Sequence, residues 1–315
     1  MSLKAPSIYT KEKILQAIDP LLILEEIERG LVCYSQKQTI TSPIGFLHFD
    51  EPPADVHIKS GAILDNDLYV VKIASSFYEN PAKNLPSSNG LMLLFSQKTG
   101  ELLAILQDEG YLTDLRTGLA GAIAAKYLCT GKVEKIGILG TGTQARHQLQ
   151  ALQWVTSCRQ VLVWGRNAMR AGAFCRDPDL ANFQISAAKS IDQIAEQCNL
   201  IVTTTPSSHP LLFGHQIRPG THITAVGADG PGKQEIDSSL FERADLIAVD
   251  SYAQCRQYGD LSHVDPAATL PLIELGELIA RKPQQNLSIT IADLTGVAVE
   301  DLQIAKAVYA RLLCQ

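Results

Sequence analysis

A glycine-rich loop in the middle of the chain carries the residue pattern of a nucleotide site. It reads Gly-Thr-Gly-Thr-Gln-Ala over residues 140–145, after the apolar stretch KIGIL and before a helical pattern. In that context the first glycine allows a tight turn, the second lets a pyrophosphate approach the backbone, and the alanine lets helix and strand pack closely. The N–H groups that begin the helix would face the phosphates. The predicted cofactor-binding residues of this loop are Gly140, Gly142, Thr143, Gln144 and Ala145.

The end of the next expected strand indicates which dinucleotide binds. An acidic residue about 20 residues after the loop would bond the ribose hydroxyls of NAD. The sequence has no acid there and places Arg166 and Asn167 instead. A guanidinium can pair with a 2′-phosphate, so we predict that NADP(H) is favoured over NAD(H), unless Arg166 only opens a helix. Further cofactor-binding residues are expected at the ends of later strands: Thr204, Val226 and Gly227.

Four other side chains are of types that could take part in catalysis or substrate binding. Lys72 lies in the apolar run YVVKIA. If this lysine is buried, its ammonium needs an anionic partner; if its strand is at the edge of a sheet, the ammonium can face solvent. The planar guanidinium of Arg116 suits bidentate binding of a carboxylate or an ion pair within the chain. Asp229 follows an expected strand, where a carboxylate can shuttle a proton or form a turn. His57 lies in a strand-like stretch, as a substrate contact or a hydrogen-bonded strand histidine.

The first of two stretches that must position these residues covers about residues 1–115. Short apolar runs alternate there with turn-forming residues, such as the Ser-Ser-Asn-Gly of 87–90, which favours antiparallel strands. A helical pattern over 11–30 is broken at Pro20. The expected strands cover 55–60, 68–74 and 91–95.

The second stretch alternates helices with near-continuous apolar strands, which is typical of a parallel sheet covered on both faces. The last helix could return to the first part of the chain. We therefore predict an α/β fold: a Rossmann-type doubly wound parallel sheet plus a discontinuous α+β domain. The predicted domains are 1–115 with 299–315, and 116–298. The expected strands are 133–139, 160–164, 199–204, 221–226, 245–249 and 287–292, and the expected helices are 115–128, 143–155, 168–175 and 299–313.

Composition excludes several other classes of protein. The net charge of −6 argues against a nucleic-acid or anionic-membrane surface. No uncharged apolar run reaches about 18 residues, so no membrane span is expected. The seven cysteines form no CxxC pair and the histidines no HxxxH spacing, so we expect no metal site and a reducing, cytoplasmic location.

Spaced motifs in one order carry a family resemblance. They are Val-Lys-Ile at 71–73, Leu-Pro-Ser-Ser-Asn-Gly at 85–90, Leu-Thr-Asp-Leu-Arg-Thr at 112–117, the loop at 140–145, Ala-Val-Gly-Ala-Asp-Gly-Pro-Gly-Lys at 225–233, and Glu-Asp at 300–301. With these motifs the chain resembles the ornithine cyclodeaminase/mu-crystallin family along nearly its whole length. That family includes cyclodeaminases, ketimine and pyrroline-2-carboxylate reductases, and alanine-type dehydrogenases. The resemblance implies a homodimer, with residues 1–115 and 299–315 as the substrate-binding and dimerisation domain and an active site in the cleft beside the Rossmann domain.

The resemblance also implies a role for each candidate. Lys72 would pair with the substrate carboxylate and polarise the carbon–nitrogen bond, Arg116 would clamp the α-carboxylate, and Asp229 would be catalytic. His57 stands where, in our alignment, ornithine cyclodeaminases carry a glutamate of the substrate site, which argues against a substrate with a distal ammonium.

These roles together predict an oxidoreductase: NAD(P)H-dependent reduction of a small cyclic α-imino acid. The alternatives are an ornithine cyclodeaminase, an amino-acid dehydrogenase of the same family, and a mu-crystallin-like binding protein.

Overall fold

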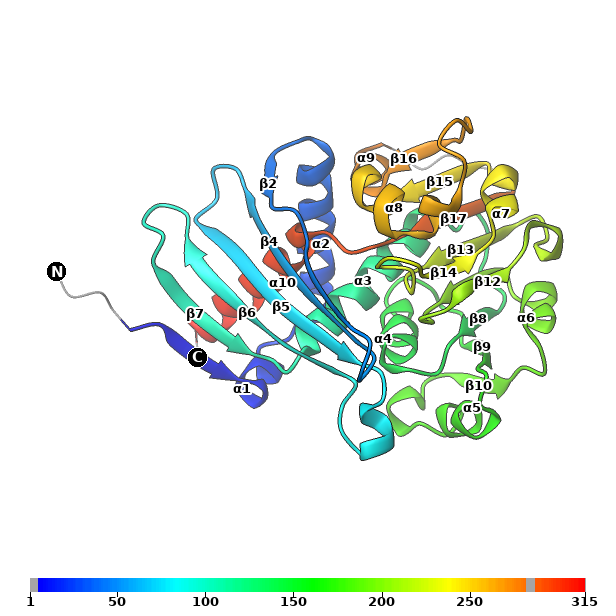
Figure 1. Cartoon of the computed structure of the whole chain (residues 1–315), viewed down its shortest axis with the longest axis horizontal. Coiled ribbons are helices and arrows are strands. Elements are labelled where there is room, and N and C mark those ends of the chain that lie inside the picture. The colour runs from blue at the N-terminus through cyan, green and yellow to red at the C-terminus, as the bar shows by residue number, and fades with distance from the viewer. Residues whose placement is uncertain (1–4, 282–286, 315) are drawn as a thin grey trace. The chain divides into compact units, whose positions relative to one another are not determined.

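The computed structural model describes residues 5–281 and 287–314, and the chain divides into two compact units. Unit 1 holds Met1–Arg116 and Val297–Gln315, and unit 2 holds Thr117–Gly296. The chain leaves unit 1 within a helix and returns to it with the last helix (Figure 1). Substrate binding and dimerisation by one part, and dinucleotide binding by the other, stay predictions.

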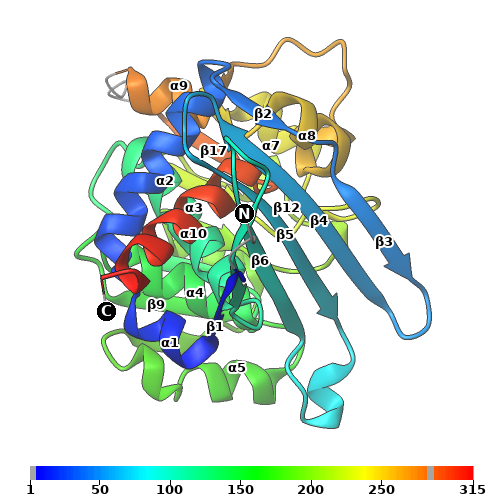
Figure 2. The same ribbon diagram turned by 90° about the vertical axis from the view of Figure 1, so that its left-hand side faces the viewer.

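Unit 1 is built on a mostly antiparallel sheet with the strand order β1-β7-β6-β5-β4-β2, in which β3 also pairs with β4. Only the β1–β7 pair among these is parallel, so the predicted antiparallel pairing is confirmed for the central strands. Helices α2 and α10 cover one face of the sheet (Figure 2). The strands are β1 (Ser7–Thr10), β2 (Thr39–Thr41), β3 (Gly45–Phe49), β4 (Ala54–Ile63), β5 (Leu68–Phe77), β6 (Ser88–Ser96) and β7 (Leu102–Gln107). The helices are α1 (Lys11–Gln16), α2 (Pro20–Ser35), the 3₁₀ helix η1 (Asn80–Lys83), the start of α3 (Tyr111–Leu128), and α10 (Ala298–Leu312).

Several boundaries in unit 1 differ from the sequence prediction, since β4 and β5 each end three residues later than expected, and two of the differences have a local cause. The expected turn at 87–90 is wrong, because β6 already begins at Ser88. Gly90 lies opposite Ala74, and a Cβ there would come within 2.5 Å of the Ile73 carbonyl oxygen, so this glycine permits close strand approach. Helix α3 begins at Tyr111 rather than at residue 115, because Leu112 N donates to Asp108 Oδ2 (2.7 Å).

Unit 2 is built on a parallel sheet with the strand order β10-β9-β8-β11-β13-β17-β15-β16. The chain runs from β8 outward through β9 to β10, and then returns to the other side of β8 with β11 and β13. A reversal between β8 and β11 is the order of the Rossmann fold, so the predicted doubly wound parallel sheet is confirmed. The strands are β8 (Ile136–Leu139), β9 (Gln160–Trp164), β10 (Gln184–Ala187), β11 (Leu200–Thr203), β13 (Thr221–Ala225), β15 (Leu246–Val249), β16 (Leu272–Glu274) and β17 (Ile289–Asp293), with a separate parallel pair of β12 (Ser208–Leu212) and β14 (Gln234–Ile236).

Alternate residues of the central strands build two cores, one on each face of this sheet. Ile136 and Ile138 belong to one apolar cluster, whereas Leu139 belongs to the other. All these strand residues are therefore buried, which explains the continuous apolar runs in the sequence. Among the described residues, no helix is long and apolar enough to cross a membrane. The helices of unit 2, after α3, are α4 (Thr143–Leu152), α5 (Ala168–Phe174), α6 (Ile191–Gln197), α7 (Ser238–Arg243), α8 (Tyr252–Tyr258) and α9 (Leu275–Ala280), with 3₁₀ helices η2 (Pro178–Leu180), η3 (Gly214–Gln216) and η4 (Asp260–His263).

Candidate active site

Five buried charged residues lie together inside unit 1. Lys72 of β5 stands directly opposite Lys59 of β4, and the two residues are 1% and 4% exposed. Lys72 Nζ lies 3.1 Å from Asp301 Oδ2 on α10. Arg116 of α3 reaches the same helix, with Nη1 2.9 Å from Glu300 Oε2 and Nε 3.0 Å from Asp301 Oδ1. We call Lys59, Lys72, Arg116, Glu300 and Asp301 the cationic cluster.

The cationic cluster holds three cationic side chains and two carboxylates, so its formal charge is +1. Burial lowers the pKa of Lys72 to about 7, although the neighbouring Asp301 charge acts in the opposite direction. Burial alone would raise the pKa of Asp301, but the charges of Lys72, Arg116 and Lys59 outweigh it and lower that pKa. A buried charge is costly unless it is paired, so the contacts of Lys72 and Arg116 with the two carboxylates stabilise the cluster.

The structure decides between alternatives that the sequence left open. Strand β5 lies between β4 and β6, so Lys72 is not an edge lysine facing solvent. Arg116 does form an ion pair within the chain, with Glu300 and Asp301. Its role toward a substrate carboxylate stays a proposal.

His57 lies two residues before Lys59 on β4 and therefore on the same face of the sheet. It stands opposite Ala74, and its ring packs edge-to-face against Phe46 with the centroids 5.0 Å apart. This half-buried position is compatible with both predicted roles of the histidine, a substrate contact and a strand residue.

Sequence reasoning missed the remaining members of the cationic cluster. Lys59 is separated from His57 by one residue in VHIKSG, but only the strand register places it opposite Lys72. Glu300 and Asp301 were noted only as a motif. Two adjacent acids inside the apolar run VAVEDLQIA are an unusual pattern, and they could have signalled buried partners for cations.

In unit 2 the glycine loop connects β8 to α4, and its geometry fits a dinucleotide pyrophosphate. Gly140 has φ of 125°, and a Cβ there would collide with the Thr204 hydroxyl oxygen. Gly142 is the N-cap of α4 without a side-chain cap, and a Cβ there would meet open space. Ala145 is fully buried against the sheet. The loop therefore combines a tight turn, an open approach and an uncapped helix start, which are the features that phosphate binding requires.

The other predicted cofactor residues lie at the carboxyl ends of neighbouring strands. Arg166 follows β9 and is exposed, and Asn167 caps α5 by accepting from the N–H groups of Met169 and Arg170. Thr204 follows β11 and donates twice to the Leu139 carbonyl, which ties the end of β11 to the end of β8. Val226 and Gly227, respectively, are the first and second residues after β13.

Asp229 lies in the loop between β13 and β14 and forms an ion pair that the sequence analysis did not anticipate. Lys233 Nζ lies 2.7 Å from Asp229 Oδ1. The side chain of Asp229 is 39% exposed and that of Lys233 is 16% exposed. The carboxylate is thus held by a cation within its own loop and is open to solvent.

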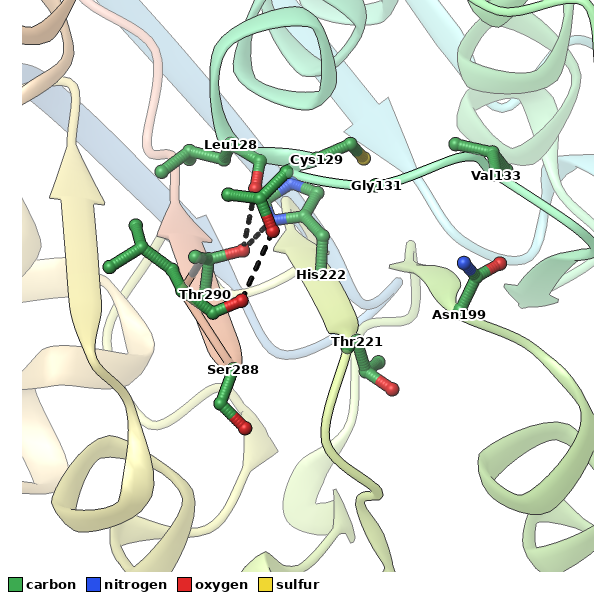
Figure 3. Close-up of a pocket in the computed structure, with 12 residues that line it drawn as sticks. Leu128, Cys129, Gly131, Val133, Asn199, Thr221, His222, Ser288 and Thr290 are labelled. Atoms are coloured by element: carbon green, nitrogen blue, oxygen red, sulfur yellow. Dashed lines mark hydrogen bonds between the residues drawn. The ribbon is translucent and has the colours of Figure 1, made fainter. Parts of the chain in front are cut away.

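A small cavity lies at the amino-terminal ends of β13 and β17 (Figure 3). The predicted cofactor residues lie at the other, carboxyl ends of the strands. His222 bonds there to the hydroxyl groups of Thr290 and Thr224, both at 2.9 Å. Burial lowers the pKa of His222 to about 3, so the ring is neutral. With a volume of ≈ 10 Å³ the cavity has room for about one water molecule. Ligands of such sheets bind beyond the carboxyl ends of the strands, so we assign this cavity no catalytic role.

The fold of unit 2 and its glycine loop define a Rossmann-type dinucleotide-binding protein. Residues 7–315 match the ornithine cyclodeaminase/mu-crystallin family. The chain belongs to this family, and the resemblance seen in the sequence is confirmed.

Among curated relatives, an uncharacterised cyclodeaminase of Sinorhizobium fredii is 39% identical over 85% of this chain and 84% of its own. The ketimine reductase mu-crystallin of Rattus norvegicus is 34% identical over 74% of this chain and 73% of its own.

Two solved structures show the same fold with a nicotinamide cofactor bound. An archaeal alanine dehydrogenase dimer with NAD is 31% identical, with a TM-score of 0.86 over 98% of this chain and 96% of its own. The pyrroline-2-carboxylate reductase of Thermococcus litoralis, in complex with NADH and L-proline, is 27% identical, with a TM-score of 0.87 over 98% of this chain and 97% of its own. The comparisons bear out the predicted class of enzyme, an NAD(P)-dependent oxidoreductase of amino and imino acids.

Proposed function

We propose that this protein reduces a small cyclic α-imino acid, of the ketimine or pyrroline-2-carboxylate type, with NAD(P)H. The observation that carries the proposal is the cationic cluster of unit 1, whose buried ammonium and guanidinium groups suit a substrate carboxylate. The names of the mu-crystallin and pyrroline-2-carboxylate reductase relatives support the same reaction class.

Each candidate residue would have a distinct task. Lys72 and Arg116 would hold the substrate carboxylate, and their charge would make the imine carbon more electrophilic. Asp229, directly or through water, would relay a proton from solvent to the imine nitrogen. A bound NAD(P)H supplies the hydride for the imine carbon, so one hydride and one proton convert the imine to the amine. The cofactor would bind at the loop of residues 140–145, with Arg166 favouring NADP(H) through its 2′-phosphate.

Ornithine cyclodeamination is the main alternative, and a relative is named a cyclodeaminase. Ornithine carries a distal ammonium, which must exchange its hydration for an anionic or hydrogen-bonding partner. The same face of β4 carries Asp55, His57 and Lys59. The Asp55 carboxylate is already bound by His48 Nδ1 (2.8 Å) and by the Tyr78 hydroxyl (2.5 Å). The two carboxylates of the cationic cluster are already within 3.1 Å of Lys72 and Arg116. This arrangement favours a substrate without a second ammonium.

A cofactor-consumption assay separates these reactions. NADPH and NADH would each be tested with pyrroline-2-carboxylate, piperideine-2-carboxylate and pyruvate plus amines, and ornithine would be tested with NAD. We expect stoichiometric loss of NADPH with a cyclic imino acid and little ammonia from ornithine. Ammonia release from ornithine with catalytic NAD and no net reduction would reject the proposal in favour of the cyclodeaminase. Consumption of reduced cofactor with pyruvate plus an amine, and not with the cyclic imino acids, would favour the amino-acid dehydrogenase.

The substitution His57→Glu tests the substrate argument within the same assay. A carboxylate at position 57 would give a distal ammonium a partner that is not already bound within the chain, so ornithine binding should strengthen relative to binding of the imino acid. Phe46→Leu changes the neighbour of the ring without adding charge and serves as the control. An unchanged preference in His57→Glu would show that position 57 does not contact the substrate.

We also propose a homodimer formed through the uncovered face of the sheet in unit 1. Leu47, Phe49, Ile58 and Ile73 are large apolar residues on β3, β4 and β5 that are each more than a third exposed. Ile58 and Ile73 stand opposite each other in the sheet, so they form a continuous apolar surface. Light scattering should give twice the chain mass, and the double substitution Ile58→Lys with Ile73→Lys should give the monomer. A monomeric wild type would reject this part of the proposal.

A further inference from the structure

Glu235 of β14 is fully buried in unit 2, and donors surround its carboxylate. Thr205 donates to Oε1 through its N–H (2.5 Å) and its hydroxyl (2.8 Å). Thr203 Oγ1 donates to Oε2 at 2.6 Å, and Gly227 N donates to the same oxygen at 2.8 Å. Oε1 therefore binds the segment that follows β11, and Oε2 binds both the end of β11 and the segment that follows β13.

The backbone at Gly227 lies so close to this carboxylate that only a glycine fits there. A Cβ at Gly227 would lie 2.6 Å from Glu235 Oε2 and would also collide with the Thr205 carbonyl oxygen. The loop that starts at Gly227 carries Asp229 and ends at β14, so Glu235 anchors both of its ends. The glycine and the carboxylate together set the distance between the two strand ends.

Two further carboxylates, those of Asp260 and Asp293, fix the backbone that carries Glu235. Asp260 Oδ1 accepts from the N–H groups of Glu235 (2.6 Å) and Ile236 (2.9 Å). Asp293, at the end of β17, accepts from the N–H groups of Asp260 (3.2 Å) and Leu261 (2.9 Å). We call Glu235, Asp260 and Asp293 the carboxylate ladder, because each of its first two members is held through its own backbone by the next.

The carboxylate ladder lies at the strand ends where a Rossmann fold binds the nicotinamide half of a dinucleotide. In a Rossmann sheet the phosphates lie at the first glycine loop, here after β8, and the adenosine half extends toward the next strand, here β9. The other half of the dinucleotide, with the nicotinamide, lies over the strands beyond the reversal, here β11 and β13. Those are the two strand ends that Glu235 joins.

We propose that Glu235 is a positioning residue for the nicotinamide half of the cofactor, acting through the ends of β11 and β13 and the loop that carries Asp229. This inference rests on the proposed function, since it assumes a nicotinamide dinucleotide. It assigns Glu235 no contact with substrate or cofactor.

The substitution Glu235→Gln tests the role of both oxygens. In either protonation state a carboxyl group can accept both backbone N–H groups, because the hydroxyls of Thr203 and Thr205 can rotate. A glutamine turns two acceptor positions into N–H donors, and one of them must face the N–H of Thr205 or Gly227. The strand ends should then move apart without loss of the glycine loop. Glu196→Gln, an exposed glutamate on α6, is the matched control.

The readout is binding, measured by calorimetry with the reduced cofactor and with ADP-ribose or its 2′-phosphate, which lack the nicotinamide. We expect Glu235→Gln to weaken binding of the reduced cofactor about tenfold and to change ADP-ribose binding less than twofold. The fluorescence of the bound nicotinamide should shift toward that of free cofactor. Glu196→Gln should match the wild type in all three measurements.

Other outcomes overturn the inference. Equal weakening of both ligands would mean that Glu235 only supports the fold, and unchanged binding would mean that it has no positioning role. If Glu235→Gln does not fold, Thr203→Val removes one donor isosterically. It should weaken binding of the reduced cofactor about threefold and leave binding of ADP-ribose unchanged. Equal effects on the binding of both ligands would again overturn the inference. A wild type that binds the cofactor but reduces no imino acid would reject the proposed function alone, because the binding ratio does not depend on turnover.

Discussion

The two units each bury a group of charged side chains, and the groups are built in opposite ways. The cationic cluster of unit 1 pairs side chains with side chains, as between Lys72 and Asp301. The carboxylate ladder of unit 2 is held mainly by backbone N–H groups, as between Glu235 and Asp260. Burial lowers the pKa of Lys72 to about 7, but it raises the pKa of Glu235 to about 8 and that of Asp260 to about 7.

This contrast separates groups that can exchange partners from groups that cannot. An ion pair between side chains can be replaced by a pair with a substrate carboxylate through rotation of a few bonds. A bond to a backbone N–H breaks only if the strand end itself moves. We therefore expect substitutions in the cationic cluster to change turnover and substitutions in the carboxylate ladder to change cofactor geometry and stability.

The largest effect is expected from Lys72→Met. Without the ammonium, a substrate carboxylate loses a buried charge-assisted partner, so turnover with the imino acid should fall about 10²–10³-fold. NADPH binding should remain nearly intact, because the glycine loop belongs to unit 2. Steady-state kinetics and calorimetry measure the two quantities separately.

Lys98→Met is the control for Lys72→Met, because the Lys98 side chain is 77% exposed and pairs only with a surface carboxylate among its described ion pairs. It should keep wild-type turnover. Equal loss of rate and cofactor affinity in Lys72→Met would show that the lysine is structural and that the contrast between the two groups is wrong.

A somewhat smaller effect is expected from Arg166→Asp, which lies outside both buried groups. The change replaces a phosphate partner by a partner for ribose hydroxyls. A lost charge-assisted bond contributes about 1.5–3 kcal/mol, so affinity for NADPH should fall about ten- to a hundredfold while affinity for NADH improves. Arg176→Asp, also exposed and on the same unit, should leave the preference unchanged. A wild type that already prefers NADH would contradict the assignment of Arg166.

The pH dependence of kcat/KM should report the cationic cluster. The charged form of Lys72 is the active one, and burial lowers its pKa to about 7 in the free protein. Hence kcat/KM should fall as pH rises through about 7, by up to about tenfold per unit. A bound carboxylate favours the ammonium, so kcat should fall only at higher pH. A kcat/KM that stays flat from pH 6 to 9 would mean that Lys72 does not titrate in the reaction.

The smallest effect is expected from Asp260→Asn. Oδ1 of Asp260 accepts both backbone bonds and Oδ2 has no hydrogen-bond partner, so an amide can keep the bonds that Oδ1 makes. The asparagine brings N–H groups to the buried Oδ2 position, but it also removes the cost of ionising this buried carboxyl, so the free energy of unfolding at pH 7.5 should change by less than about 1 kcal/mol. Glu235→Gln disturbs bonds to two strand ends and should cost about 1–3 kcal/mol.

Asp260→Asn should also change how stability depends on pH. Burial raises the pKa of Asp260 from 3.8 to about 7, so the folded protein binds the proton more tightly than the unfolded chain. Stability from this group is present below pH 4 and is lost as pH rises toward 7, and the asparagine should remove that part of the slope. Urea unfolding of the wild type and of Asp260→Asn at pH 5 and pH 7.5 measures this pH dependence of the free energy of unfolding. An unchanged slope would mean that Asp260 is ionised across this range.

The class of fold and the glycine loop could be predicted from the sequence because both depend on local patterns. Continuous apolar runs between helices indicate buried parallel strands, and the spacing of residues 140–145 indicates a phosphate loop. The last strand and helix were also predicted within two residues, because apolar residues recur along both of them.

The two buried charged groups, by contrast, could be found only in the tertiary structure. Lys59 meets Lys72 through strand register, and Glu300 and Asp301 reach Arg116 from a helix 184 residues away in the chain. Glu235 lies on β14, and only its side-chain hydrogen bonds connect it to the ends of β11 and β13. The sequence by itself determined the class of fold, the loop for a dinucleotide and the identity of single candidates such as Lys72. Their partners were decided by tertiary structure alone, because a buried charge is paired by residues that are near in space, and sequence spacing carries no information on that distance.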